Sequence, residues 1–329
     1  MQLTRLKDIA EKAGVSIRTV NRVLKNQPNV KQHIIDQVKA IAEELQYFPN
    51  LTAQSLKSNI NNDIILVTPT IPINSIESIE GIEKAVMENH LNLKILLTLD
   101  VKDIKELIKR AFSQKPKGII FVKHEKIEEL LKYNIAKVPY IVLQGDSDKF
   151  NSIDFDRAAG VRDSIIYLYK NGSRRIAYMG FNKAIDIPSK GRLDGYLAGI
   201  AECGLKPIYL PMPKAQNQFE IAREIGRNFK SLDPLPDAVQ CYSDYAALGF
   251  MAGLHDKGYN IKETVKIVGF NNANISKTSS PPLSTVALPF FDLGKIAVEA
   301  ILESYSNPKK ANKLIQIKLK ASLEIRETT

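Results

Sequence analysis

Apolar residues recur at helical spacing from the start of the chain. In the segment "LKDIAEKAG", Leu6, Ile9, Ala10 and Ala13 fall on one stripe, which is typical of an amphipathic helix. Gly14 follows at once and supplies the left-handed conformation that ends many helices. The pattern therefore predicts a first short helix that ends at Gly14.

Two further amphipathic segments follow in the first 46 residues. "VSIRTVNRVLK" has Ser16 as a candidate N-cap, and Val20, Val23 and Leu24 share its apolar face. After the polar break "NQPNV", residues 31–45 repeat the helical pattern, and the proline of "YFPN" cannot continue it. The first 46 residues are thus expected to form three short helices.

The hydrophobic pattern changes at residue 64, where short apolar runs begin. These runs are "DIILVTPT", "LKILLTL", "KGIIFVK", "VPYIVLQ", "RRIAYMG", "KPIYLPM", "DAVQCY" and "VKIVGFN". Amphipathic stretches separate them, at 77–90, 102–113, 126–132, 157–171, 192–203, 218–230, 244–258 and 291–305. Apolar strands that alternate with helices predict parallel sheets in doubly wound α/β units. Because so many units exceed one sheet, we expect two similar lobes.

The first two segments have the plan of a helix-turn-helix: a short helix, the tight turn "AGVS" and a second helix with a polar outer face. That outer face carries Ile17, Arg18, Asn21 and Arg22. Arginine matches the guanine edge through two hydrogen bonds, and Ile17 suits a thymine methyl group. Ser16 and Thr19 are short donors suited to phosphate. The alternative is a three-helix bundle for protein contacts, with solvated arginines.

Charge favours the DNA-binding interpretation. The chain has 46 Lys and Arg against 36 Asp and Glu, a net charge of +10. Residues 1–60 contain nine basic and five acidic residues, and the other 269 contain 37 and 31. The net positive charge per residue is therefore about three times higher in the N-terminal segment, as suits a polyanionic partner.

Other sequence features exclude several classes of protein. No apolar run approaches a membrane span and no signal peptide begins the chain, so we expect a cytoplasmic protein. Cys203 and Cys241 are isolated, and four scattered histidines form no metal-ligand pattern, so no metal is expected. The chain has no phosphate-binding loop, dinucleotide motif or nucleophile motif, so we expect no cofactor and no enzymatic activity.

Residues 6–58 resemble the headpiece of the lactose-repressor (LacI/GalR) family of bacterial transcription regulators. The resemblance lies in "DIAEKAGVSIRTVNRVLK" and "ELQYFPNLTAQSLK". It implies that Ile17 and Arg18 help to choose the operator. Asn21 replaces the usual serine and Gln54 a usual arginine of the family. Residues 51–57 resemble its hinge helix, with Leu56 as the side chain that wedges between base steps; a plain linker is the alternative.

The remaining chain resembles the family's core, which is built like a periplasmic sugar-binding protein. Matching segments include "DRAAGVRDSIIYLYKNGSRRIAYMG" and "SPPLSTVALP". The resemblance implies that the chain crosses between two lobes near 156–158, 285–289 and 309–313. The expected division is a headpiece at 1–50, a hinge at 51–62, and a body at 63–329 with lobe 1 at 63–157 and 288–311 and lobe 2 at 158–287 and 312–329.

By the same resemblance a small-molecule effector, with a carbohydrate expected, lies between the lobes. The candidate contacts are Asn74, Ser75, Gln144, Arg192, Ser243 and Asn271. Arg192 suits hydroxyls or a carboxylate, with a surface salt bridge as the alternative. Asn271 stands where the family usually has Asp, and Ser243 where it often has Asn; Asp244 is expected only to cap a helix. Asn74 and Ser75 replace an aromatic pair, which removes the rings on which an apolar sugar face would stack.

The leading hypothesis is a homodimeric repressor that reads a pseudo-palindromic operator and responds to an effector. No heptad tail follows "SLEIRETT", which favours a dimer over a tetramer. A solute-binding protein of a transporter would need a signal peptide and no headpiece. A DNA-associated enzyme on the same core would need a catalytic cluster that the sequence does not provide.

Overall fold

The computed structural model divides into two units, Met1–Asn61 and Asn62–Thr329. The structure describes residues 4–24, 27–47, 61–68, 76–97, 104–123, 126–134, 137–145, 147–181, 190–213, 217–307 and 313–329. The hinge at 51–57 with Leu56, and the candidate contacts Asn74 and Ser75, lie outside these residues.

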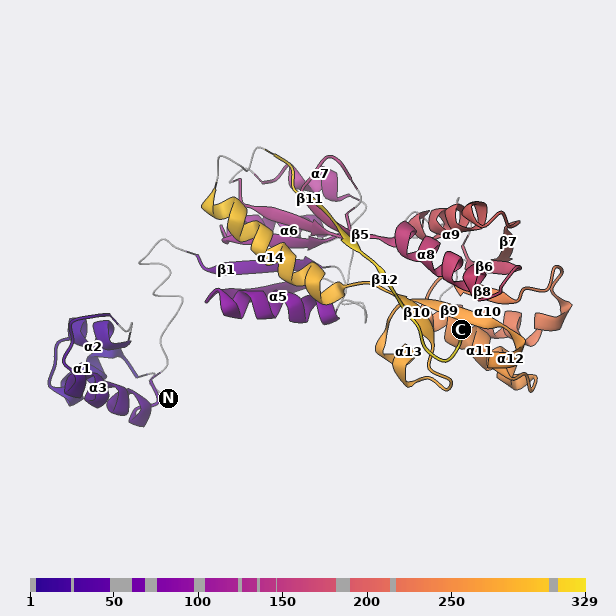
Figure 1. Ribbon diagram of the computed structural model, residues 1–329. Coiled ribbons are helices and arrows are strands. Elements are labelled where there is room, and N and C mark those ends of the chain that lie inside the picture. Colours follow the sequence, from indigo (N-terminus) through magenta and orange to yellow (C-terminus); the bar gives the residue numbers. More distant parts are fainter. Residues whose placement is uncertain are drawn as a thin grey trace. The chain divides into compact units, whose positions relative to one another are not determined.

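The N-terminal unit contains helices α1 (Leu6–Ala13), α2 (Ile17–Leu24) and α3 (Gln32–Glu44), which confirms the three predicted helices (Figure 1). Their apolar faces meet in one small core made of Ile9, Ala10, Ala13, Val20, Val23, Val38 and Ala42. Gly14 ends α1 with φ 63°, and its N–H donates to the carbonyls of Ala10 and Glu11. The predicted glycine stop is therefore confirmed.

In the second unit, the described strands form two six-stranded sheets. The first sheet has the order β11-β5-β4-β3-β1-β2, and all its pairs are parallel. Its strands are β1 (Asp63–Thr68), β2 (Asn92–Leu97), β3 (Gly118–Val122), β4 (Tyr140–Leu143), β5 (Ser152–Asp156) and β11 (Gln316–Lys320).

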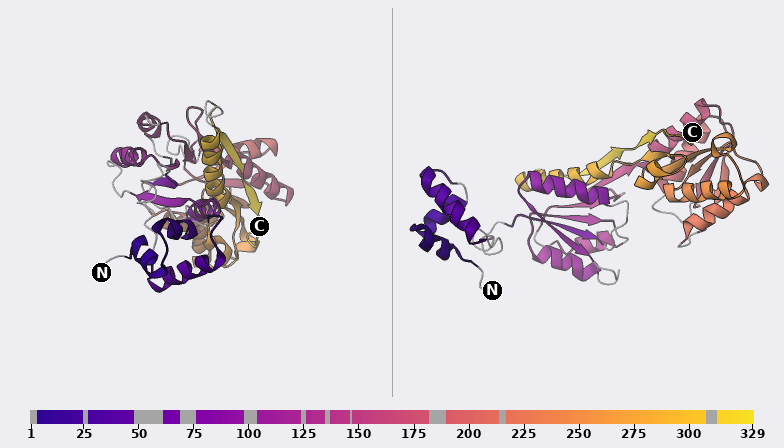
Figure 2. Two further views of the ribbon diagram at one scale, coloured as in Figure 1. Left: turned by 90° about the vertical axis from the view of Figure 1, so that its left-hand side faces the viewer. Right: turned by 90° about the horizontal axis from the view of Figure 1, so that it is seen from below.

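Helices cover both faces of the first sheet (Figure 2, right). Alternate residues of β1 explain this, because side chains in a strand point to opposite faces in turn. Ile64 and Leu66 join the core beneath α5 (Ile76–Glu88) and α14 (Phe290–Ser306). Ile65 and Val67 join a separate core beneath α6 (Ile104–Ser113) and α7 (Ile127–Leu131).

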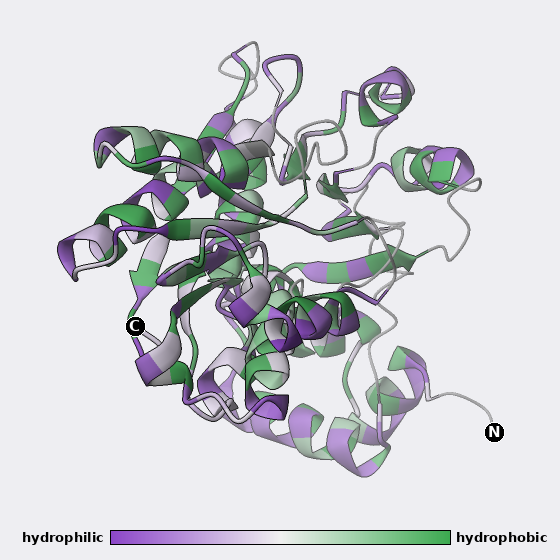
Figure 3. Cartoon of the chain, turned by 90° about the vertical axis from the view of Figure 1, so that its right-hand side faces the viewer, coloured by the Kyte–Doolittle hydropathy of each residue, from purple (hydrophilic) through white to green (hydrophobic). Residues whose placement is uncertain are grey.

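The second sheet has the order β12-β10-β9-β8-β6-β7 and is parallel except where β12 meets β10. Its strands are β6 (Ile176–Gly180), β7 (Ile208–Pro211), β8 (Ala238–Cys241), β9 (Lys266–Asn271), β10 (Ser284–Ala287) and β12 (Ser322–Glu324). Apolar residues concentrate in the strands and on one side of each helix (Figure 3). The two-sheet α/β body confirms the predicted fold class.

Helices also cover both faces of the second sheet. One face carries α8 (Arg157–Lys170) and α9 (Lys190–Glu202), packed in the core that contains Ile176 and Tyr178. The other carries α10 (Gln218–Arg227), α11 (Asp244–Asp256) and α12 (Ile261–Thr264), packed on Ala177 and Met179. The short helix α13 (Asn274–Thr278) follows β9.

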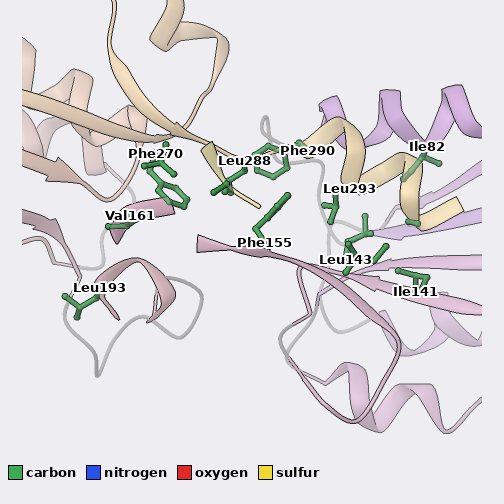
Figure 4. Close-up of a cluster of buried hydrophobic side chains, with 14 of the residues drawn as sticks. Ile82, Ile141, Leu143, Phe155, Val161, Leu193, Phe270, Leu288, Phe290 and Leu293 are labelled. Atoms are coloured by element: carbon green, nitrogen blue, oxygen red, sulfur yellow. The ribbon is translucent and has the colours of Figure 1, made fainter. Parts of the chain in front are cut away.

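The chain passes between the sheets after β5, after β10 and between β11 and β12. Near these passages Phe155, Leu288 and Phe290 lie close together (Figure 4), and the rings of Phe155 and Phe290 are 5.0 Å apart. The expected third crossing at 309–313 is wrong. Because β11 pairs with β5 in the first sheet, this crossing falls between Lys320 and Ser322.

Candidate DNA-reading helix and effector site

The outer face of α2 is exposed because its inner face is committed to the headpiece core. Val20 and Val23 are 0% and 1% exposed, whereas Ile17 is 48% exposed and Arg18 is also exposed. The helix sequence "IRTVNRVL" contains no acidic residue that could neutralise Arg18 locally. The arrangement presents an apolar side chain and an unshielded guanidinium at the N-terminus of one rigid helix.

Ser16 and Thr19 form a hydrogen-bonded pair at the start of α2. The Thr19 N–H donates to Ser16 Oγ at 3.1 Å, so the predicted N-cap is confirmed. The two hydroxyl oxygens are 2.9 Å apart, and either can donate to the other. Their positions keep both hydroxyls at the helix N-terminus, where the helix dipole favours an anion such as phosphate.

Arg22 has contacts that the sequence did not indicate. Its Nη2 donates to the carbonyl of Pro28 at 2.7 Å and lies 3.3 Å from that of Asn29. The side chain therefore fastens the end of α2 to the loop before α3. Asn21, one residue earlier, is half-buried. A reading role for these two residues stays a prediction, and Arg22 also has a structural role.

The second sheet contains a point where the winding direction of the chain reverses. Strand β6 lies beside β8, and the helices that follow them, α9 and α11, pack on opposite faces of the sheet. In open α/β sheets such a switch point, at the carboxyl ends of the strands, is where ligands bind. Here Phe181 follows β6 and Tyr242 follows β8, with ring centroids 4.6 Å apart.

Arg192, in the first turn of α9, lies against this point. Its guanidinium carbon is 4.4 Å from the ring centroid of Tyr242 and 4.5 Å from that of Phe270. Its Nε and Nη1 are buried without a hydrogen-bond partner in the structure. A surface salt bridge, the alternative for this residue, is absent among the described ion pairs. An unpaired buried donor costs free energy, so this side chain is a candidate ligand contact.

Ser243 and Asn271 lie at the ends of the neighbouring strands β8 and β9, next in sequence to the rings that flank Arg192. Asn271 has φ 107°, a sparsely populated conformation of the kind that gathers at functional sites. Ser243 caps α11, because its Oγ accepts from the Ala246 N–H at 3.2 Å. The hydroxyl can still donate to a ligand.

The sequence suggested that Asp244 caps α11, but the structure shows a different role. Its side chain is turned into the protein, where its two oxygens accept from the Ala273 N–H at 2.7 Å and from Thr285 Oγ1 at 2.5 Å. Burial raises the pKa of Asp244 to about 6. Asp244 thus ties α11 to β10 and to the loop after β9, and this holds Asn271 in place.

Gln144 belongs to the first sheet, where it follows β4. Its Oε1 accepts from Arg157 Nη2 at 3.2 Å, and Arg157 Nη1 pairs with Asp154 at 2.6 Å. Gln144 is therefore fixed by the first residue of α8, at a passage between the sheets. The structure brings Arg192, Ser243 and Asn271 to one edge of the second sheet and places Gln144 on the other sheet.

Sequence reasoning missed the rings of Phe181, Tyr242 and Phe270. Tyr242 and Phe270 belong to predicted apolar runs and Phe181 directly follows one, and none of the three was singled out as a site residue. Their position could have indicated a site, because each aromatic residue lies at the carboxyl end of a parallel strand near a switch point. Together the rings and Arg192 form an apolar site with a few polar groups, as small-molecule sites generally do.

The fold and these two sites define a class of protein: a helix-turn-helix headpiece joined to a two-lobed α/β body of the binding-protein type. Comparison with known proteins agrees. Residues 5–50 match the model of bacterial regulatory proteins of the lacI family, and residues 165–329 match that of a periplasmic binding protein-like domain. The chain belongs to the lacI family of bacterial regulators.

Individual relatives cover nearly the whole chain. Catabolite control protein A of Priestia megaterium is 29% identical over 98% of this chain and 98% of its own. The transcriptional repressor CytR of Escherichia coli K12 is 26% identical over 91% and 89%. The crystal structure of the Lac repressor dimer bound to operator and the anti-inducer ONPF matches with TM-score 0.83 and 23% identity, over 100% of this chain and 99% of that one. These relatives are regulators and not enzymes.

No described helix is long and apolar enough to cross a membrane. Among the described residues, no group of His, Cys, Asp and Glu side chains could hold a metal ion.

Proposed function

We propose that this chain is a homodimeric, sequence-specific repressor whose operator affinity changes when a small molecule binds beside Arg192. The observation that carries the DNA-binding part is the exposed outer face of α2. Ile17 and Arg18 project from a helix whose opposite face is locked into a core, which gives a reader of fixed orientation. The expected location is the cytoplasm, where the DNA is.

The effector part rests on two buried guanidinium nitrogens of Arg192, Nε and Nη1, which have no acceptor, and on the rings around them. Ser243 and Asn271 extend the polar surface of that site, and Gln144 is proposed to contact the ligand from the first sheet. Helix α9 packs closely on α8, which begins at the passage after β5, and Asp244 at the start of α11 accepts a hydrogen bond from Thr285 of β10. A ligand at this edge is therefore linked through packed elements to two of the passages between the sheets. The relatives' names support a regulator of transcription.

Arg18 variants test the reading role. We expect operator sequences selected by the full chain to be two-fold symmetric, because a symmetric dimer presents two copies of α2. On such an operator, Arg18→Ala should relax the preference at one base pair per half-site. The free energy that discriminates the preferred base from the others at that position should fall by about 1–3 kcal/mol. Arg18→Lys should keep affinity for random DNA but lose the preference, since it has no planar fork.

The readout is fluorescence anisotropy with operator and with random DNA, at one stated salt concentration, because phosphate contacts make all these affinities salt-dependent. Lys39→Ala, which removes an exposed charge from α3, is the control and should leave the ratio of the two affinities unchanged. Equal preference in wild type and Arg18→Ala would remove Arg18 from the reading surface.

A further inference from the structure

We propose that the effector is an acid, a small polyhydroxylated molecule whose carboxylate pairs with Arg192. This inference rests on the proposed function and assigns the ligand class of that same site. Three observations support it. Two buried guanidinium nitrogens of Arg192 lack a partner, the carboxylate nearest in sequence to the flanking rings accepts hydrogen bonds from other groups, and Ser243 and Asn271 beside the rings are neutral.

Arg192 differs from other partly buried arginines of the body because its buried N–H groups have no hydrogen-bond acceptor. Arg157 pairs with Asp154 at 2.6 Å and also donates to Gln144. Arg326 donates to the Leu283 carbonyl at 2.6 Å and to Asn272 Oδ1 at 2.6 Å. Arg192 has buried Nε and Nη1 atoms with no acceptor at all.

The aromatic rings do not replace the missing acceptor. Rings at 4.4 Å and 4.5 Å attract the cation through their faces. The N–H groups of a guanidinium lie in its own plane, and they need an in-plane oxygen pair such as a carboxylate provides. The rings therefore orient the guanidinium and leave its N–H groups for a ligand.

Among the described residues, the carboxylates close in sequence to this site are not available to Arg192. Asp244 follows Tyr242 by two residues, but its oxygens accept from Thr285 and Ala273. Asp194 lies two residues from Arg192 on the same helix, a spacing at which side chains do not face each other. Asn271, at the end of β9 beside Phe270, is neutral. A partly buried cation with no counter-charge in the described part of the chain favours a ligand that brings one.

The remaining groups of the site favour hydroxyls on the same ligand. The Asn271 amide can both donate and accept, and the Ser243 hydroxyl can donate while its oxygen caps α11. The apolar faces of Phe181 and Tyr242 suit the C–H face of a ring or chain. A sugar acid combines these features, and a neutral sugar would leave the charge of Arg192 unmatched.

Matched pairs of compounds test the inference in calorimetry with the full-length protein at pH 7. The pairs are glucose and glucuronate, galactose and galacturonate, and ribose and ribonate. We expect the acid of at least one pair to bind about 30- to 100-fold tighter than its neutral partner, as for loss of one charge-assisted contact. Arg192→Met should remove that preference and Arg192→Lys should retain part of it.

Arg162→Met is the matched control, because Arg162 lies exposed on α8 and pairs with Glu202 at 3.6 Å. It should leave the preference unchanged. Thermal unfolding and circular dichroism show whether the Arg192 variants fold, and Arg192→Gln provides a second substitution of similar length. The inference fails if no acid binds, if the neutral partners bind equally well, or if Arg192→Met keeps the preference.

Failure of this inference and failure of the proposed function give different results. A neutral sugar that binds wild type and changes its affinity for operator DNA would overturn the acid and leave the proposed function intact. An acid that binds through Arg192 without any change in operator affinity would support the inference and contradict the effector role.

Discussion

At the residue scale, burial gives Asp244 an unusual dependence on pH. The pKa of Asp244 is raised to about 6 from 3.8 by burial. Since the folded chain binds this proton more tightly than the unfolded chain, protonation stabilises the fold fully below about pH 4. That stabilisation is lost as pH rises through about 6.

Asp244→Asn removes this titration. We expect the free energy of unfolding of wild type, relative to the variant, to fall by up to about 3 kcal/mol between pH 4 and 7, given the shift to about 6. Urea unfolding at several pH values measures it. Asp163→Asn, at an exposed residue of α8, is the control, and its pH profile should follow that of wild type. Parallel profiles for wild type and Asp244→Asn would refute the assignment.

Residue identity alone predicted only part of the two sites. Ser16, Gly14 and the inward valines of α2 followed from spacing, because caps and helical periodicity are local properties. The partners of Asp244, Arg22 and Arg192 did not, because Thr285, the Pro28 carbonyl and the ring of Phe270 come from other segments. Spacing could not distinguish a cap at Asp244 from a buried tie between elements.

At the element scale, two glycines allow α5 and α14 to pack closely. A Cβ added at Gly81 would lie 2.0 Å from the Phe291 carbonyl oxygen, and one at Gly294 would lie 1.9 Å from that of Ser78. Both obstacles are backbone atoms, so neither helix can yield by turning a side chain.

We therefore expect Gly81→Ala to lower the free energy of unfolding by about 1–3 kcal/mol, because overpacking forces the helices apart. Chemical unfolding of the full chain measures the change. Glu299→Ala, on the exposed side of α14, should change it by less than about 0.5 kcal/mol. An unchanged midpoint for Gly81→Ala would show that the helices can separate freely.

The eight predicted strands all occur, and they are the ones with continuous apolar runs. The sequence did not reveal β5, β10, β11 and β12, the strands at the passages between sheets. In β11, half-buried residues alternate with exposed ones, so an alternating pattern was its only indication. In β10, the buried polar residues Ser284 and Thr285 interrupt the apolar run. Their hydroxyls are satisfied by hydrogen bonds to Thr329 and Asp244. Without β11, the third crossing was placed too early.

At the scale of the whole molecule, the proposal couples two sites on different units of the chain. Such coupling is reciprocal: an effector that changes operator affinity by some factor must have its own affinity changed by the operator by the same factor. The ligand can shift the balance only through its different affinity for the two forms of the body. Arg192 is the contact through which we expect that difference to arise.

The most direct test measures this reciprocal coupling between effector and operator. It uses the compound that binds tightest among the acid and sugar pairs. Operator affinity is measured with and without saturating compound, and compound affinity with and without operator. We expect both to change by the same factor, about 5- to 150-fold. Arg192→Met should abolish the change while it leaves compound-free operator binding intact. Operator affinity that is the same with and without bound compound would contradict the account.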